Sequence, residues 1–329
     1  MIKNTLKKLF IKISRILGYE IIDQNEFVSP TLSKELNQNL SEFNKKSIVL
    51  PLGEIKITRK VKKLLIVFRT NSKIEIWDQN KKRIFEEKKI VYVEKSLKSL
   101  IKSIKLSKKN LPSLIIKLII LDDNSTDENL SKIKNIVESS DIDYQLITHN
   151  VDKYIKIIKK QKTNDTYSNL STLLTSFNIG KNEGEDLIFF VEDDYLHFET
   201  MITEVIKTYE RVASQLKKDI FICPADYPYL YMNNEKTNLI IGDNRHWRTV
   251  NKSLCTFFIS KQLLTKYWEN LEKNCTDRHD PFEKYINEIY NTEVCVSPLK
   301  SLSVHFTNIN SSYGLSPFID YKKLWNESK

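Results

Sequence analysis

The sequence contains few cysteines, and none is placed for a metal site or a disulfide framework. The four are widely spaced, with no C-x-x-C pair and no histidine at ligand spacing (Cys223, Cys255, Cys275 and Cys295). This pattern argues against both a zinc site and a disulfide-stabilised domain.

Long hydrophobic runs are also absent. No stretch reaches the ~18 apolar residues that a membrane-spanning helix needs. The N-terminus is basic, but it lacks the continuous apolar core and the small-residue cleavage site of a secretory signal. We therefore expect a cytoplasmic protein, either free or peripheral on the inner face of the membrane.

The composition is otherwise that of an ordinary globular protein. The chain has 329 residues, of which 40% are hydrophobic and 29% charged, and its formal net charge is +10. This charge favours anionic partners such as nucleotides or phospholipid surfaces, although it also fits a general bias toward lysine. The lysines are dispersed and not clustered with aromatic residues, so we expect no nucleic-acid partner.

Residues 3–17 have the spacing of a basic amphipathic helix that stops at Gly18. Such a helix is suited to an anionic membrane interface; the alternative is a helix that packs on its own domain. One face is apolar (Leu6, Leu9, Phe10, Ile13, Ile16 and Leu17) and the other basic, without an acid (Lys3, Lys7, Lys8, Lys12 and Arg15).

We divide the chain into a helix at 1–18, a linker or accessory segment at 19–60 and one α/β domain at 61–329. The accessory segment has weak strand signals at 47–50 and 55–58. From residue 61, short apolar strands alternate with helical patterns, which predicts a mostly parallel sheet flanked by helices. The expected strands are 64–68, 114–121, 144–148 and 187–191, and the expected helices are 91–104, a segment ending near 137, and 168–179.

Polar residues follow three of these strands at the point where each strand ends. In a parallel sheet the carboxyl ends of the strands meet at one edge, where ligands bind. Clustered carboxylates repel one another and need a compensating charge, for which a divalent cation is the simplest candidate. The alternatives are a polar turn, and for Ser125 and Glu128 a helix capping box. The three groups are Arg69, Thr70 and Asn71; Asp122 and Asp123; and Glu192, Asp193 and Asp194.

Two segments carry a resemblance to a known family. LIILDDNSTDENL and NIGKNEGEDLIFFVEDDYLHF resemble the nucleotide-binding segment and the D-x-D region of family 2 glycosyltransferases, in the right order, within residues 61–200. The resemblance implies a GT-A (Rossmann-like) fold that binds a nucleotide-diphosphate sugar and Mn²⁺ or Mg²⁺. It places Asp123 on the nucleotide base, and Glu192 and Asp194 on the ribose and the metal. The chain departs from the pattern in having Glu at the first acid and Asp193 as a further acid.

Their place at the same strand ends adds five residues to the expected nucleotide-binding set: Arg69, Thr70, Asn71, Asp122 and Asp193. Residues 201–329 would form the acceptor-binding half. There His246, Trp247 and Arg248 concentrate a ring nitrogen, an indole and a guanidinium in one loop, which fits an acceptor site; the alternative is a solvated loop with a buried Trp.

Three further residues are candidates for catalysis and metal binding. By the resemblance, Asp280 is the first candidate for the catalytic base and Asp277 the second, ahead of a helix at 282–290. Asp280 followed by Pro281 and Glu283 also fits a helix N-cap. His305 is a candidate third metal ligand, and the Ser- and Gly-containing stretch 306–317 would suit a loop that closes over the nucleotide.

The expected function is a metal-dependent, inverting hexosyltransferase or related enzyme. It would move a sugar from a nucleotide diphosphate to a glycan or lipid-linked acceptor in cell-envelope glycan or polysaccharide synthesis. One alternative is a sugar nucleotidyltransferase, although those enzymes have a Gly-rich loop after the first strand and FRTNSK has no glycine. The others are a degenerate transferase and a non-catalytic basic membrane-surface protein.

Overall fold

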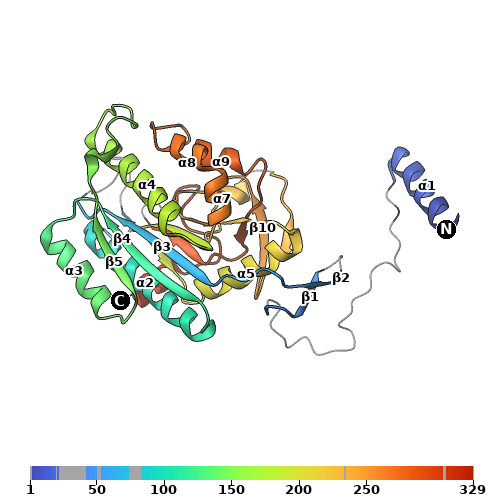
Figure 1. Cartoon of the computed structure of the whole chain (residues 1–329), viewed down its shortest axis with the longest axis horizontal. Coiled ribbons are helices and arrows are strands. Elements are labelled where there is room, and N and C mark those ends of the chain that lie inside the picture. The colour runs from blue at the N-terminus through green and yellow to red at the C-terminus, as the bar shows by residue number, and fades with distance from the viewer. Residues whose placement is uncertain are drawn as a thin grey trace.

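A computed structural model describes residues 2–19, 21, 42–49, 53–73, 83–232, 235–306 and 309–328. Much of the predicted accessory segment, and residues 307 and 308 of the predicted loop, lie outside the described residues. In the described part of the chain, three elements precede the main sheet (Figure 1). They are helix α1 (Ile2–Ile16) and the antiparallel strands β1 (Lys46–Val49) and β2 (Gly53–Lys56). None of the described helices has the length and apolar character needed to cross a membrane.

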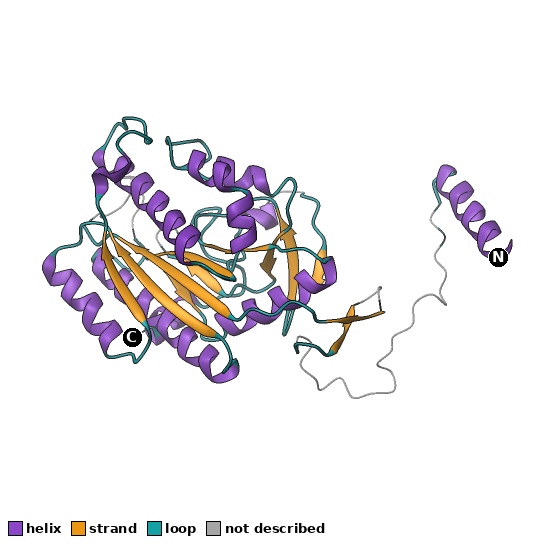
Figure 2. Ribbon diagram, viewed as in Figure 1, coloured by secondary structure: helices purple, strands orange, loops and turns teal. Residues whose placement is uncertain are grey.

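The main sheet contains nine strands, and the predicted α/β class is confirmed (Figure 2). One half is parallel, in the order β5 (Tyr144–Thr148), β4 (Ile115–Asp122), β3 (Lys63–Thr70) and β6 (Leu187–Glu192), which is the order of a Rossmann-like half-sheet. The other half continues from β6 with mixed directions: β11 (Phe257–Ser260), β8 (Phe221–Ile222), β12 (Cys295–Pro298), β10 (His246–Val250) and β9 (Leu239–Ile241).

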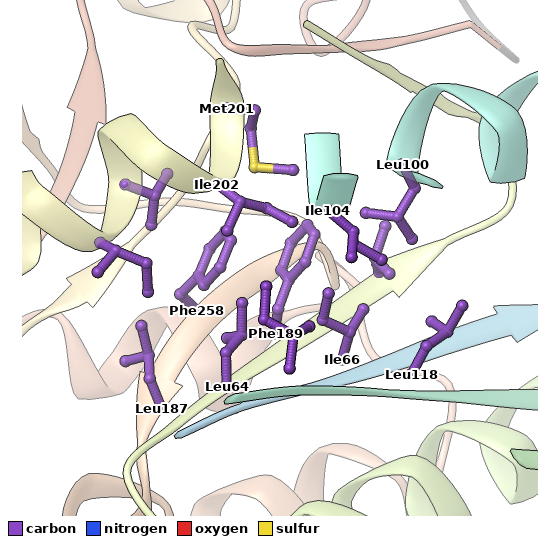
Figure 3. Packing of buried hydrophobic residues seen from close by; sticks show 14 of the residues in the cluster. Leu64, Ile66, Leu100, Ile104, Leu118, Leu187, Phe189, Met201, Ile202 and Phe258 are labelled. Atoms are coloured by element: carbon purple, nitrogen blue, oxygen red, sulfur yellow. The ribbon is translucent and has the colours of Figure 1, made fainter. Parts of the chain in front are cut away.

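Helices cover both faces of the sheet because the central strands are apolar on both sides. Alternate residues of β3 belong to different cores: Leu64 and Ile66 lie on one face, Leu65 and Val67 on the other. Figure 3 shows the first core, which also contains Phe189 from β6. The first face is covered by α2 (Lys89–Asn110), α3 (Asp127–Glu138) and α5 (Met201–Leu216), and the second by α4 (Asn164–Glu183), α7 (Lys261–Lys266), α8 (Trp268–Asn274) and α9 (Lys284–Ile289).

A small antiparallel pair lies beside the site edge of the sheet. β7 (Tyr195–His197) directly follows the acids of β6, and β13 (Ser303–His305) pairs with it. Helix α10 (Tyr321–Glu327) joins this region through an aromatic cluster in which Trp325 stacks on Phe85 with ring centroids 4.3 Å apart.

The capping predictions need correction at two helix starts. The hydroxyl of Thr126, not Ser125, caps α3 by accepting from Asn129 N, while Ser125 Oγ accepts from Ser72 N. Helix α9 begins at Lys284, so Asp280 lies too far before it to cap it. The residue at its N-cap, Glu283, makes no side-chain capping bond.

Candidate functional site

The predicted polar residues meet at the carboxyl ends of β3, β4 and β6. Thr70 pairs in register with Asp122, and Arg69 pairs with Glu192. β3 lies between β4 and β6, where the order of strands along the chain reverses, and such a switch point is where ligands bind in open α/β sheets. The site is therefore built by the carboxyl ends of three adjacent parallel strands.

Arg69 neutralises the first acid of the β6 cluster. Its guanidinium is 2.7 Å from Glu192 Oε1 and also donates to Asn169 Oδ1. Burial raises the pKa of Glu192, and the charge of Arg69 opposes that rise. Glu192 thus has a compensating cation within the protein.

Asp193 holds the loop after β3 and the start of α2. Its carboxylate accepts hydrogen bonds from Thr70 Oγ1 and Asn71 N, both at 3.0 Å, and is 2.5 Å from Lys89 Nζ. Asp193 is buried. Through these contacts Asp193 fixes the loop after β3 against helix α2 beside the site.

Asp122 and Asp123 differ in their surroundings. Asp122 is fully buried and accepts from Ser125 N, and burial raises the pKa of its carboxyl. Asp123 Oδ2 accepts from Asn71 Nδ2 at 3.1 Å and from Ser168 Oγ at 2.5 Å. Its other oxygen is buried without a hydrogen-bond partner among the described residues. That oxygen is suited to accept a hydrogen bond from a ligand.

Asp194 and His305, 111 residues apart, come together because β13 pairs with β7. Asp194 Oδ2 is 3.0 Å from His305 Nε2, and Phe306 N donates to the backbone oxygen of Asp194. The ring of Tyr195 stacks on the imidazole at 4.9 Å. Burial acts to lower the pKa of His305, but the charge and hydrogen bond of Asp194 and the charge of Glu192 together outweigh it, so the pKa is raised.

These two side chains fit a divalent cation shared with a ligand. The described residues contain no group of three or more His, Cys, Asp or Glu placed to hold a metal ion. Mg²⁺, however, is commonly bound by one or two carboxylates, with substrate phosphates and water completing its shell, and neutral imidazole is a ligand for Mn²⁺. Asp194 and His305 match such a site, whereas Glu192 is paired with Arg69.

Glu283 is a candidate functional residue that the sequence interpretation assigned only to helix capping. It lies near Glu192 and accepts a weak hydrogen bond from Cys255 Sγ at 3.8 Å. Burial, followed by the charge of Glu192, raises the pKa of Glu283 to about 8. The sequence did contain this residue three positions after Asp280, but the capping-box pattern explained it, and its nearness to Glu192 depends on the fold.

Asp277 and Asp280 lie outside this group. Asp277 accepts from Gln161 Nε2, lies 3.1 Å from Lys159 Nζ, and has its pKa lowered, first by the Gln161 hydrogen bond. Asp280 is exposed, with no hydrogen bond or ion pair to any described residue. The lowered pKa of Asp277 makes that carboxylate a weaker base.

The three predicted acceptor-binding residues lie on strand β10, and their side chains differ in their surroundings. Trp247 has no exposed surface and packs in the first core, so it forms no wall of an open site. Arg248 is buried against Asp226 and lies over the Tyr231 ring at 4.4 Å, while His246 is exposed. Three strands separate β10 from β6. The structure therefore does not bring this trio to Asp194.

Comparison with family models gave no match, and neither did comparison with curated proteins. Solved structures do match. The galactosyltransferase LgtC, in complex with donor and acceptor sugar analogues, is 11% identical at a TM-score of 0.35, over 69% of this chain and 70% of its own. UDP-glucose pyrophosphorylase in complex with UDP-glucose is 9% identical at a TM-score of 0.37, and the match covers 82% of this chain and 97% of that one. GalNAc-T7 in complex with UDP, GalNAc and Mn²⁺ is 9% identical at a TM-score of 0.42, and the match covers 81% of this chain and 49% of that one.

The neighbours thus include glycosyltransferases and a sugar-nucleotide pyrophosphorylase.

Proposed function

We propose that the protein is a metal-dependent glycosyltransferase that moves a sugar from a nucleotide diphosphate to a hydroxyl acceptor. The observation that carries this proposal is the pairing of Asp194 with His305 at the switch point of the sheet, 3.0 Å apart. Beside them the remaining acids of the cluster are already neutralised by Arg69 and Lys89. Asp194 and His305 together offer a carboxylate and an imidazole to a cation that carries a diphosphate.

The nucleoside would lie over the ends of β3 and β4. Asp123 presents a buried carboxylate oxygen there, and Asn71 and Ser168 hold the carboxylate in place. A base or ribose donor reaching this oxygen would satisfy a buried acceptor that otherwise costs free energy. This arrangement supports the predicted nucleotide-binding role of Asp123.

Asp194 and His305 would hold Mn²⁺ or Mg²⁺. When bound, the metal would neutralise charge on the departing diphosphate. His305 must be neutral to act as a ligand, so metal binding and protonation of this imidazole compete.

For an inverting reaction we infer that Glu283 is the base, in preference to the predicted Asp280 and Asp277. The acceptor oxygen forms a bond to the anomeric carbon, the bond from that carbon to the phosphate oxygen breaks, and the diphosphate leaves with its electron pair. Glu283 takes the acceptor proton. Its burial near Glu192 gives it the basicity this role needs.

The acceptor and the location of the protein are also part of the proposal. Helix α1 exposes Leu9, Phe10 and Ile16, at 54%, 62% and 78% of their surfaces. With the basic residues of the same helix, this face would hold the enzyme on the inner face of a membrane, where a lipid-linked acceptor for cell-envelope glycan synthesis would be met.

The test is nucleoside diphosphate release from a panel of nucleotide sugars, with Mn²⁺ and with EDTA. We expect slow hydrolysis of one donor that needs the metal and is lost in Asp194→Asn. The matched control is Glu128→Gln, which changes an exposed acid that forms an ion pair with Lys132 on helix α3. Equal rates in EDTA, or no loss in Asp194→Asn, would contradict the proposal. Release of pyrophosphate from a nucleoside triphosphate and a sugar phosphate would favour a nucleotidyltransferase.

A further inference from the structure

The segment 151–162 connects the end of β5 to the start of α4 and borders the candidate site. At one end, His149 N donates to the backbone oxygen of Asp122. At the other, α4 contributes Ser168 and Asn169, which contact Asp123 and Arg69. The segment therefore lies at the same edge of the sheet as the site.

The fold holds this segment firmly. Tyr154 and Ile158 are buried in the second core, with 7% and 4% of their surfaces exposed. Lys159 N donates to the backbone oxygen of Thr276 at 2.8 Å, and its side chain pairs with Asp277. The outward side chains are thus presented from an anchored backbone.

Those outward side chains are apolar and basic together. Ile155 and Ile157 have 66% and 43% of their surfaces exposed. The segment contains a single acid, Asp152, and its five lysines are all exposed (Lys153, Lys156, Lys159, Lys160 and Lys162). Exposing two large aliphatic side chains within three residues has no benefit for folding in water.

We propose that residues 151–162 form a second membrane-contact surface, which binds an anionic phospholipid bilayer and turns the site edge toward it. The lysines match the negative charge of the lipid headgroups, and the isoleucines match the acyl boundary, which a nucleic acid or a soluble polyanion does not offer. Stable attachment of a peripheral protein generally takes two signals, and α1 would be the other. The proposal goes beyond glycosyl transfer, because lipid binding by this surface does not depend on turnover.

The chain offers a direct probe, because Cys223, Cys255, Cys275 and Cys295 are all buried. A single exposed cysteine introduced as Ile157→Cys will take an environment-sensitive fluorophore selectively. The matched control is Ile115→Cys, at a residue 60% exposed at the start of β4, on the opposite edge of the sheet. The full-length chain is used in both cases.

Vesicles of phosphatidylcholine and phosphatidylglycerol in equal parts are then added, with pure phosphatidylcholine as the neutral comparison. We expect a blue shift for the label at 157 on the anionic vesicles only, and none for the label at 115. The unlabelled double variant Ile155→Ser/Ile157→Ser should bind the anionic vesicles about tenfold more weakly than wild type, at an unchanged melting temperature.

Three results would overturn the proposal: no shift at position 157 while the protein is vesicle-bound, equal shifts at 157 and 115, or wild-type binding by the double serine variant. Loss of binding in Lys156→Glu/Lys160→Glu without loss in the serine variant, together with competition by a DNA duplex, would identify a general polyanion surface instead. These readouts do not involve donor turnover, so they separate failure of this proposal from failure of the proposed transferase activity.

Discussion

At the scale of single residues, the site is an arrangement of carboxylates with different partners. Arg69 neutralises Glu192, Lys89 neutralises Asp193, and His305 lies against Asp194. Although the three acids are adjacent in sequence, each carboxylate has a different partner and therefore a different environment.

The first residue-scale prediction concerns Glu283. A carboxyl whose pKa is raised to about 8 is protonated below that pH and becomes a base as the pH rises through it. We therefore expect kcat/KM to rise with pH, to reach half of its maximum near pH 8 and to level off above that pH; a bound cation that offsets the charge of Glu192 would move this rise to lower pH. Glu283→Gln should lower kcat by about 10²–10⁴-fold with little change in donor binding, measured by steady-state kinetics across pH. Asp280→Asn is the control, and a loss of activity in that variant alone would return the base to Asp280.

A second prediction concerns the ion pair of Arg69 with Glu192. Removing the guanidinium leaves a largely buried carboxylate without its cation, so Arg69→Gln should lower the free energy of unfolding by about 1–3 kcal/mol. Lys63→Gln breaks an exposed pair with Glu185 and should cost less than about 1 kcal/mol. Urea unfolding compares the two, and equal losses would show that burial does not distinguish these pairs.

At the scale of elements, the pairing of strands β7 and β13 brings His305 to Asp194. The two strands have only three residues each, and their register places His305 opposite Tyr195. The aromatic cluster of α10 packs behind them, with Phe306 and Trp325 at a ring separation of 5.8 Å. The last helix of the chain therefore supports a residue of the candidate metal site.

This support can be tested with Trp325→Ala. Because the indole is buried against Phe85, its removal should cost roughly 3 kcal/mol and also lower metal-dependent donor hydrolysis, since Phe306 adjoins His305. Thermal unfolding and nucleoside diphosphate release measure the two effects. The control is Phe318→Ala, at a side chain 90% exposed, which should change neither quantity. If Trp325→Ala is destabilised but hydrolyses the donor at the wild-type rate, α10 does not support the candidate metal site.

At the scale of the whole molecule, the net charge of +10 and the apolar face of α1 suggest a protein that works against an anionic surface. Removing residues 2–18 should weaken binding to anionic vesicles, and added salt should weaken it further because the basic residues are screened. Donor hydrolysis in solution should be unchanged, because the described side chains of this helix are mostly exposed. Co-sedimentation and nucleoside diphosphate release test both statements; a loss of hydrolysis would show that α1 also serves the catalytic domain.

The sequence by itself determined the local elements and where their polar ends fall. Apolar runs such as 64–68 and 187–191 predict strands because each buries both faces, and the acids that follow them had to meet at one edge once the strands were parallel. The amphipathic spacing of residues 3–17 is likewise local information.

Tertiary structure alone decided which partner each acid receives. The contact of Asp194 with His305, the interaction of Glu283 with Glu192 and the burial of Trp247 all depend on packing between segments far apart in the chain. The helix start at Lys284 had the same origin, since capping residues were present at Asp280 and packing selected a later start. Local propensity is weak compared with the burial of a whole apolar face, so packing overrides it where the two compete.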